Sequence, residues 1–293
     1  MRVKVYAKLN LTLSVGARQG EFHPIDSVAT SINLYDTVEV LPRADRAIYV
    51  YGVDDIPTHS NTAYRAACAF VEAFSTPGVD ISIQKGIPFG GGLGGSSADA
   101  AAVLYCMCRL HGVDVGCGKI REICSLLGCD VTFMLHGGLG RLRGKGDEVE
   151  YFALAQPLYF ALTTFAQEMS SREVYSSFDR INKYSFDKDK LQQPFADERN
   201  VELLTLLQQG ASDKALQYLH NDLQSAATAI SDYAEQYLRF TESHGLCTVM
   251  TGSGSAYYVA FASRAEAENA VNLLNSQGYS TILCQTVSCG IEV

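Results

Sequence analysis

The chain has 293 residues, 47% of them hydrophobic and 19% charged, which is enough for one large globular domain or two ordinary ones. Its formal net charge of -9 argues against a nucleic-acid-binding protein, which needs a concentrated basic surface, but not against a local site for an anion. The amino terminus has no signal-peptide pattern, and no apolar run approaches the roughly 18 residues of a membrane span. We therefore expect a cytoplasmic protein with no nucleic-acid or membrane partner.

Strand and helix periods are clear in the first part of the chain. Residues 1–13 and 36–41 alternate or run apolar with β-branched side chains, which predicts strands. Residues 61–74 are rich in alanine with apolar positions at helical spacing, which predicts a helix. Residues 79–83 alternate again, and the strand predicted there ends before Pro88.

A further helix is predicted directly after the glycine-rich segment 90–95. Apolar residues recur along one helical face as far as Leu110. Ser96 and Ser97 are both good residues for capping this helix. Asp99 is expected in the first turn, where its negative charge suits the helix dipole.

The rest of the chain has the same mixture of patterns. The predicted elements are helix 119–127, hairpin 137–149, strand 158–165, helix 171–181, several amphipathic helices up to about 244, strands 247–251 and 256–261, helix 263–276 and strand 280–287. Ser263 and Glu266 have the spacing of a capping box. The strand–strand–helix–strand ending suits a split βαβ sandwich, and Pro157 marks a boundary. We expect an α+β fold with two lobes, residues 1–155 and 156–293.

The nine cysteines are an odd number without a CxxC pair, and the six histidines include no His-x-x-x-His pair. We therefore expect reduced thiols and no metal cluster.

Five glycines occupy the six positions 90–95. Each costs roughly 0.5–1 kcal/mol of conformational entropy relative to alanine, so this segment must need a bare backbone. The usual reason is a phosphate that approaches several N–H groups at a helix N-terminus. The segment is not a P-loop, because no Gly-Lys-Ser/Thr follows, and Ser97 replaces the third glycine of a dinucleotide fingerprint. The alternatives are a flexible turn for the glycines and simple helix caps for Ser96 and Ser97.

Three segments in the same order resemble the motifs of the GHMP kinases. Residues 88–101 read PFGGGLGGSSADAA and resemble the ATP-binding motif of that family. Residues 7–11 (AKLNL) and 251–255 (TGSGS) resemble its amino-terminal and carboxy-terminal motifs. The resemblance implies a two-lobed fold, with an amino-terminal lobe like ribosomal protein S5 domain 2 and a ferredoxin-like split βαβ carboxy-terminal lobe. It also implies phosphoryl transfer from ATP, with Mg²⁺, to the hydroxyl of a small molecule.

Within the family, three further segments narrow the resemblance. Residues 20–23, 128–131 and 171–175 are similar to members that phosphorylate a cytidine-diphosphate-linked polyol in the non-mevalonate route to isoprenoid precursors. We expect a monomer or a homodimer. The alternatives are another GHMP kinase, of the homoserine or mevalonate-pathway type, and a non-catalytic ATP-binding sensor.

The resemblance implies catalytic roles for two residues that lie far apart in the sequence. Asp130 would be the base that accepts the proton of the substrate hydroxyl. Lys8 would keep that carboxylate ionised and attract the hydroxyl and the γ-phosphate. From the sequence alone, Asp130 could instead cap the helix that follows it, and Lys8 could be an exposed lysine at a sheet edge.

The resemblance also implies the binding residues. Those for ATP are Asn61, Lys85, Pro88, Gly90, Gly91, Gly92, Leu93, Gly94, Gly95, Ser96 and Ser97, with Asn61 and Lys85 near the adenine and ribose. Those for the substrate are Asn10, Phe22, His23, Ser171, Tyr175, Gly252 and Gly254. Phe22 and Tyr175 would stack on the two faces of the cytosine, and His23 would bind its polar edge. The plainer alternatives are a turn residue for Asn10, a helix cap for Asn61, an exposed lysine for Lys85, core positions for the aromatic rings and a hairpin turn for Gly252 and Gly254.

Overall fold

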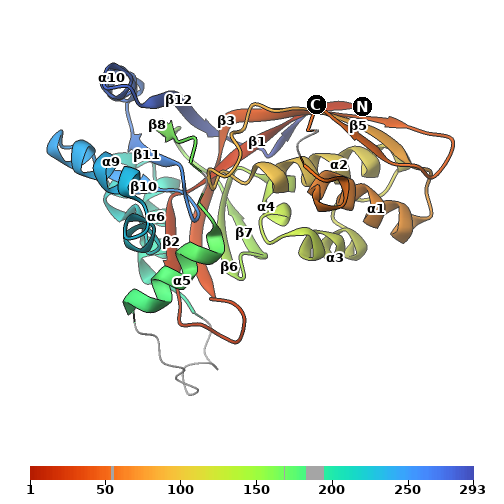
Figure 1. The fold of residues 1–293 in the computed structure, drawn as a ribbon, viewed down its shortest axis with the longest axis horizontal. Helices are drawn as coiled ribbons and strands as arrows, with labels where there is room; N and C mark the ends of the chain where they lie inside the picture. Colours follow the sequence, from red (N-terminus) through yellow and green to blue (C-terminus); the bar gives the residue numbers. More distant parts are fainter. Residues whose placement is uncertain (54–55, 168, 183–194) are drawn as a thin grey trace.

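The computed structural model, which describes residues 1–53, 56–167, 169–182 and 195–293, is organised around one long strand, β3 (Ile25–Pro42) (Figure 1). The strands that pair with it, all antiparallel, are β1 (Arg2–Asn10), β2 (Thr12–Val15), β5 (Val79–Gln84), β6 (Leu139–Gly144) and β12 (Ser280–Val287). The strands that extend the sheet from these are β4 (Tyr49–Tyr51), β7 (Glu148–Phe152), β8 (Tyr159–Thr164), β9 (His220–Asn221), β10 (Thr248–Met250), β11 (Tyr257–Phe261) and β13 (Ile291–Glu292).

Helices cover the two ends of this sheet separately. At one end, under β1, β3 and β5 in Figure 1, lie the short 3₁₀ turn η1 (Thr58–Ser60) and helices α1 (Thr62–Phe74), α2 (Gly95–His111), α3 (Gly118–Leu127) and α4 (Val131–His136). At the other end lie α5 (Ser171–Asn182), α6 (Glu198–Gln208), α7 (Ser212–Ala215), η3 (Leu216–Tyr218), α8 (Gln224–Thr228), α9 (Asp232–Ser243) and α10 (Arg264–Ser276).

Strand β1 changes character along its length. Near its start, more exposed residues alternate with buried ones, as in a sheet with one face in solvent. From Tyr6 to Asn10 every residue is buried. Helices α2 and α4 pack against the strand, and Thr251 and Tyr258 form hydrogen bonds with Asn10 at its end. Lys8 and Asn10 therefore lie in the interior, where a polar side chain must have partners.

Helix α2 is buried around almost its whole circumference, from Ala98 to Cys108 with only Tyr105 partly exposed. Its four alanines in the stretch 98–102 leave room for the close approach of α1, α4, β1 and β3, which pack around it. The sequence predicted a helix with one apolar face. The buried helix fixes the position of the glycine segment at its amino-terminal end.

Most predicted elements are present within a few residues, but several details at their ends are wrong. Helix α2 begins at Gly95 with Gly94 as its N-cap, so neither Ser96 nor Ser97 caps it. Asp99 lies beyond the first turn. Ser263 is the N-cap of α10, but its side chain makes no capping hydrogen bond, so the capping box is not formed.

The final strand returns to the beginning of the chain. β13 pairs with β1 through Lys4–Glu292 and Val5–Ile291, and Figure 1 shows the two termini side by side. β12 pairs with β8 and also with β3, so it belongs to both halves of the sheet. The division into residues 1–155 and 156–293 stays a prediction.

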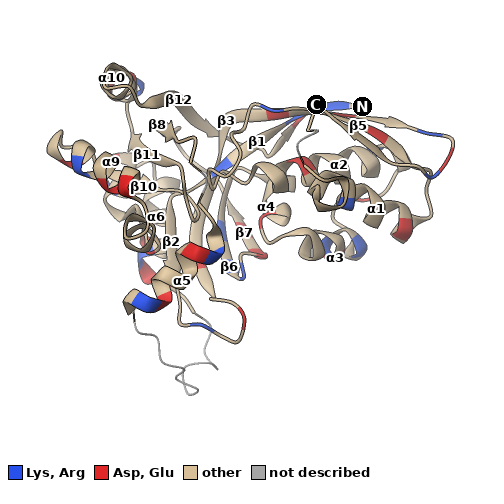
Figure 2. Ribbon diagram, viewed as in Figure 1, with Lys and Arg blue, Asp and Glu red and all other residues tan. Residues whose placement is uncertain are grey.

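Positive and negative charges are mixed along the described residues (Figure 2). Figure 2 shows lysine and arginine interspersed with aspartate and glutamate over both ends of the molecule. All nine cysteines are free thiols. In the part of the chain that the structure describes, no helix is both long enough and apolar enough to cross a membrane.

Candidate active site

The glycine segment forms a loop with its carbonyl groups turned towards the protein. Every carbonyl from Gly90 to Gly94 accepts a hydrogen bond; the donors, in order, are Ser255 N (3.1 Å), Ala256 N (3.2 Å), Thr251 Oγ1 (3.5 Å), Lys8 N (3.0 Å) and Ala98 N (2.8 Å). By contrast, no backbone N–H from Gly90 to Ser97 donates to any protein atom that the structure describes. The loop thus leaves a row of unused donors at the N-terminus of α2, which is the arrangement that binds phosphate.

Two positions show why this loop needs glycine. Gly92 has a φ of +71°, and a Cβ there would lie 2.3 Å from the carbonyl oxygen of Thr251. Gly252 has a φ of +57°, and its Cβ would lie 3.0 Å from the carbonyl oxygen of Gly92. The two glycine segments therefore pack backbone against backbone. Gly252 and Gly254 do form the turn between β10 and β11, but that turn is also one wall of the loop.

Lys8 and Asp130 lie next to this loop. Lys8 Nζ is 3.7 Å from Asp130 Oδ2, with 6% of the Lys8 side chain exposed and 34% of the Asp130 side chain. A Cβ on Gly94 would lie 3.2 Å from Lys8 Cγ, so the lysine stem runs along the loop. The alternative of an exposed edge lysine is wrong. Asp130 does occupy the N-cap position of α4, but its side chain makes no capping hydrogen bond, so its carboxylate is directed to other partners.

Asn10 connects the elements of the site. Its Oδ1 accepts hydrogen bonds from Lys8 Nζ and from Gly252 N (3.1 Å), and its Nδ2 donates to Ser27 Oγ (2.8 Å). The backbone N–H of Asn10 donates to Thr251 Oγ1 (3.1 Å). Asn10 therefore holds Lys8 and the carboxy-terminal turn in place, which is a structural role in addition to the substrate contact predicted for it.

Two of the residues predicted to bind nucleotide also have structural roles. Asn61 caps α1 by accepting hydrogen bonds from Ala63 N (2.9 Å) and Tyr64 N (3.3 Å), so the cap foreseen for it is present. Ser96 is exposed, and its carbonyl accepts a hydrogen bond from Thr62 Oγ1 (2.8 Å), which ties α1 to the loop. Contacts of these residues with a nucleotide stay predictions.

Lys85 is not the exposed lysine that the sequence allowed. Its Nζ lies between the carboxylates of Asp36 and Asp99, 2.9 Å from Asp99 Oδ2. Burial alone would lower the pKa of Lys85, but the charges of Asp99 and Asp36 outweigh burial and raise it. For Asp99, burial raises the pKa to about 7, and the nearby Asp36 carboxylate adds to this while Lys85 opposes it. Asp99 is thus a buried acid that titrates near neutral pH.

This titration predicts a pH-dependent contribution to stability. The pKa of Asp99 is about 7 in the folded protein against an ordinary value of 3.8, so the folded state binds more protons than the unfolded state between those limits. The contribution of Asp99 is therefore greatest at low pH and is lost as the pH rises towards 7. The free energy of unfolding of the parent and of Asp99→Asn is measured by urea titration. We expect the parent's value minus that of Asp99→Asn to fall from pH 5 to pH 8. A pH-independent difference between the two proteins would contradict this.

A cavity of about 730 Å³ lies next to Asp130 and contains the residues predicted to bind the substrate base. Its lining consists of Arg18, Glu21, Phe22, His23, Ile25, Cys129, Lys145, Ser171, Arg172, Tyr175, Ser176 and Asp179. Phe22 and Tyr175 come from distant parts of the sequence, and the structure brings them to the same cavity. Ser171, at the start of α5, also contacts the carboxy-terminal turn through Ser253 Oγ (2.6 Å). Cys129 in this lining directly precedes Asp130. Burial, and after it the charge of the nearby Asp130 carboxylate, raises the pKa of the Tyr175 hydroxyl, so the cavity borders the Lys8–Asp130 pair.

His23 is held tightly in the wall of this cavity. Its Nδ1 lies 2.9 Å from the carbonyl oxygen of Gly16, its Nε2 lies 3.1 Å from Asp179 Oδ1, and its ring stacks on Tyr175 with centroids 5.4 Å apart. Both ring nitrogens thus face protein atoms. A contact between His23 and the substrate base stays a prediction, and Asp179 is the partner with which a base would compete.

Sequence reasoning missed several residues of the site. Lys145 lies over the Phe22 ring at 4.7 Å from its centroid, and Lys145 and Arg172 add positive charge to the cavity. Thr251 Oγ1 donates a hydrogen bond to the Gly92 carbonyl in the glycine loop, and Asp36 holds the segment between β5 and the loop. The only sequence signal for Lys145 was its place in a glycine-rich hairpin, and Asp36 gave no signal because its partners lie 49 and more residues away.

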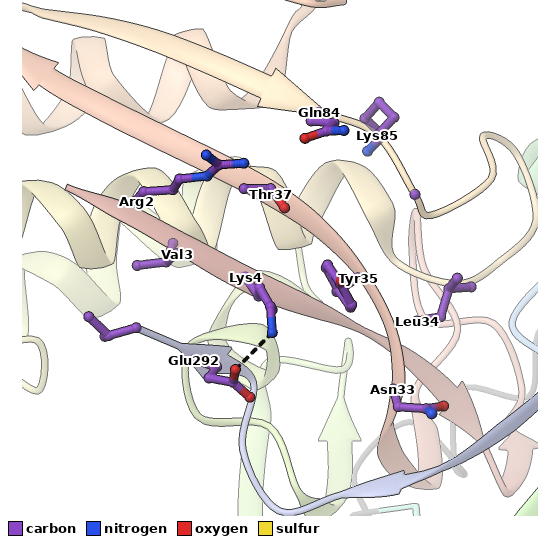
Figure 3. Close-up of a pocket in the computed structure, with 12 residues that line it drawn as sticks. Arg2, Val3, Lys4, Asn33, Leu34, Tyr35, Thr37, Gln84, Lys85 and Glu292 are labelled. Atoms are coloured by element: carbon purple, nitrogen blue, oxygen red, sulfur yellow. Dashed lines mark hydrogen bonds and ion pairs between the residues drawn. The ribbon is translucent and has the colours of Figure 1, made fainter.

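A second cavity, of about 710 Å³, lies between β1, β3 and β5 (Figure 3). Figure 3 shows an ion pair in it between Lys4 and Glu292, with Tyr35 beside them. Its lining includes Lys85 but none of the residues predicted to bind the substrate, whereas the first cavity contains Phe22 and Tyr175. We therefore place the active site at the loop and the cavity of Phe22 and Tyr175.

The site offers few ligands for Mg²⁺. The described residues include no group of three or more histidine, cysteine, aspartate or glutamate side chains that could hold a metal ion. Mg²⁺ often keeps several waters and is bound through one or two carboxylates plus substrate phosphates, so such a group is not required. The side-chain oxygen donors at the end of the loop are the hydroxyls of Ser96 and Ser97. These residues fit a magnesium ion held mainly by the phosphates of a nucleotide.

Comparison with known proteins agrees with this geometry. The model of the GHMP kinases N terminal domain matches residues 61–138, which contain the glycine loop. The 4-diphosphocytidyl-2-C-methyl-D-erythritol kinase of Acaryochloris marina is 32% identical over 91% of this chain and 88% of its own length. That of Desulfitobacterium hafniense is 31% identical over 97% and 95%.

A solved structure of a 4-(cytidine 5'-diphospho)-2C-methyl-D-erythritol kinase matches 98% of this chain and 100% of its own, with a TM-score of 0.77 and 26% identity. The predicted two-lobed α+β fold is thereby confirmed. The chain belongs to the GHMP kinases, a family of ATP-dependent small-molecule kinases, and groups there with the 4-diphosphocytidyl-2-C-methyl-D-erythritol kinases.

Proposed function

We propose that this enzyme transfers the γ-phosphoryl group of ATP to the 2-hydroxyl of 4-diphosphocytidyl-2-C-methyl-D-erythritol. The observation that carries the proposal is the row of unused N–H donors from Gly90 to Ser97 beside the Lys8–Asp130 pair. Phosphoryl transfer needs a cradle for the phosphates and a group that orients or deprotonates the attacking hydroxyl. The loop supplies the first and Asp130 the second.

The proposed mechanism assigns one task to each part of the site. The loop N–H groups and the dipole of α2 bind the triphosphate, and Mg²⁺, when bound, neutralises part of its charge. Asp130 accepts the proton of the hydroxyl as the bond between that oxygen and the γ-phosphorus forms and the bond from the γ-phosphorus to the β-phosphate oxygen breaks. ADP leaves with the electron pair of the broken bond. Lys8 stabilises the negative charge of the transferring group.

The lining of the cavity that contains Phe22 and Tyr175 supports a nucleotide-bearing substrate. Phe22 and Tyr175 offer aromatic faces for a flat base, and burial raises the pKa of the Tyr175 hydroxyl to about 12, so that ring stays neutral. Lys145 and Arg172 offer positive charge for a diphosphate. Homoserine and mevalonate contain neither a nucleobase nor a diphosphate, so a kinase for either would not need both aromatic faces and positive charge in this cavity.

We further propose that the lobes meet near residue 155 and that the enzyme works in the cytoplasm as a monomer or a homodimer. The nine free thiols support a reducing compartment.

One assay separates the candidate functions. The purified protein, ATP and Mg²⁺ are incubated with 4-diphosphocytidyl-2-C-methyl-D-erythritol, homoserine or mevalonate in turn, and ADP formation is measured. We expect turnover with the first compound alone, inhibited by CDP. Turnover with homoserine or mevalonate instead would favour a different GHMP kinase. ATP binding without turnover of any acceptor would indicate a sensor.

The aromatic residues give a sharper test of the substrate. We expect Phe22→Ala or Tyr175→Ala to raise KM for the cytidine-bearing substrate about tenfold or more, because a stacked base contributes roughly 1–3 kcal/mol. KM for ATP should stay nearly unchanged. Tyr51→Ala, at an exposed tyrosine on β4, is the matched control and should change neither constant. Parent-like KM in both cavity variants would argue against a nucleobase substrate.

A further inference from the structure

Three charged side chains are buried together behind the glycine loop. Asp36 comes from β3, Lys85 follows β5 and Asp99 belongs to α2, and 0%, 14% and 8% of their side chains are exposed. Lys85 Nζ donates to Asp36 Oδ2 and to Asp99 Oδ2 (2.9 Å). One cation thus joins two carboxylates that come from two different elements, β3 and α2.

This cluster holds both ends of the loop. Asp36 Oδ1 accepts hydrogen bonds from Gly86 N (2.7 Å) and Ile87 N (2.8 Å), the two residues directly before the loop motif. Asp99 lies one turn inside the helix that follows the loop. The two ends are also close in space, because a Cβ on Gly95 would lie 3.2 Å from Ile87 Cγ2 and 3.5 Å from Lys85 Nζ.

The cluster is poorly explained as a source of stability alone. Burying charges costs desolvation free energy, and well-packed apolar residues often replace a buried ion pair at no loss. Asp99 Oδ1 is buried and has no hydrogen-bond partner among the described residues, so the arrangement is not optimal for stability. The cluster does fix geometry, because its hydrogen bonds hold the segment after β5 and the start of α2 at a set position relative to each other. A glycine-rich segment between two fixed ends has far fewer conformations to lose when it binds a ligand.

We propose that Asp36, Lys85 and Asp99 form a clamp that holds the glycine loop, before nucleotide binds, in the conformation that leaves its N–H groups available for phosphate. The three are positioning residues, and Lys85 acts through Asp36 and Asp99 instead of contacting the adenine or ribose. The inference rests on the proposed function of the loop as the phosphate site.

The test is amide hydrogen exchange in the nucleotide-free protein. Lys85→Met keeps the length of the side chain and removes its charge. We expect loop exchange, measured at the four amides that donate to the loop carbonyls (Lys8, Ala98, Ser255 and Ala256), to become about tenfold faster or more, the effect of losing a charge-assisted hydrogen bond. KM for ATP should rise by a similar factor. Lys4→Met is the matched control. Lys4 lines the same cavity as Lys85 (Figure 3), and its ion pair with Glu292 does not touch the loop. It should leave loop exchange and KM unchanged.

The possible outcomes distinguish the clamp from its rivals. Unchanged loop exchange in Lys85→Met would overturn the clamp, and a raised KM for ATP with unchanged exchange would show that Lys85 contacts the nucleotide directly. If Lys85→Met does not fold, Asp99→Asn removes one arm of the clamp without leaving an unpaired charge, and the same faster exchange is expected. Exchange is read without substrate, so a failure to phosphorylate any acceptor would overturn the proposed function while leaving this result valid.

Discussion

Replacing Asp130 by asparagine is expected to lower kcat by roughly 10²–10⁴-fold, the usual range for loss of a general base. The substitution keeps the shape of the side chain and removes only its ability to accept a proton. It should not disturb α4, because the Asp130 side chain makes no capping bond there. ATP binding, measured by calorimetry, should be retained, because the loop N–H groups do not depend on this carboxylate. The Lys8–Asn10 hydrogen bond should also survive.

A matched control uses the same substitution away from the site. Asp114→Asn changes a carboxylate that accepts a hydrogen bond from Gly116 N (3.0 Å) in the segment between α2 and α3. We expect its kcat to stay within about twofold of the parent, as for most surface changes. If Asp130→Asn keeps a near-normal kcat, Asp130 is not the base and the hydroxyl must lose its proton by another route.

The sequence predicted well those parts of the site whose residues are unfavourable for the local backbone unless they have a function. Five glycines between a strand and a helix are unfavourable unless the backbone itself has a task, so the loop could be located without any structure. Its contact with the turn at Gly252 was also predictable, because both segments resembled motifs of a single site. Strands such as β12, rich in threonine, isoleucine and valine, were predicted at their true bounds for the same local reason.

The parts that sequence did not predict depend on partners far along the chain. In the sequence, Asp36 cannot be told apart from the other acidic residues. Its role becomes visible only in the fold, where β3 places it beside Lys85, 49 residues away. Ser96 and Ser97 looked like caps because serine is favoured there, but the loop already bends at Gly94, whose φ of +75° starts the helix without a side chain. β13 has two residues and is a strand only because β1 lies beside it. Pairing of this kind leaves no trace in local composition.

Lys8→Met is expected to lower kcat by roughly 10²–10³-fold, the effect of removing one group that stabilises transition-state charge. Methionine fills most of the volume of the buried stem, of which 6% is exposed, so packing along Gly94 should be preserved. The substitution also removes the hydrogen bond to Asn10 Oδ1, which keeps its bond from Gly252 N. The carboxy-terminal turn should therefore stay in place, and thermal unfolding should shift little compared with the fall in kcat.

The double variant decides whether Lys8 and Asp130 act together. If Lys8 stabilises the phosphoryl group in the same step in which Asp130 accepts the hydroxyl proton, the losses will not add. Lys8→Met with Asp130→Asn should then be about as slow as the slower single variant. Independent roles would instead give a double variant slower by about the product of the two factors. Their 3.7 Å separation in an otherwise buried setting favours the first result. A Lys8→Met enzyme with parent-like kcat but raised KM for ATP would show that Lys8 only binds the nucleotide.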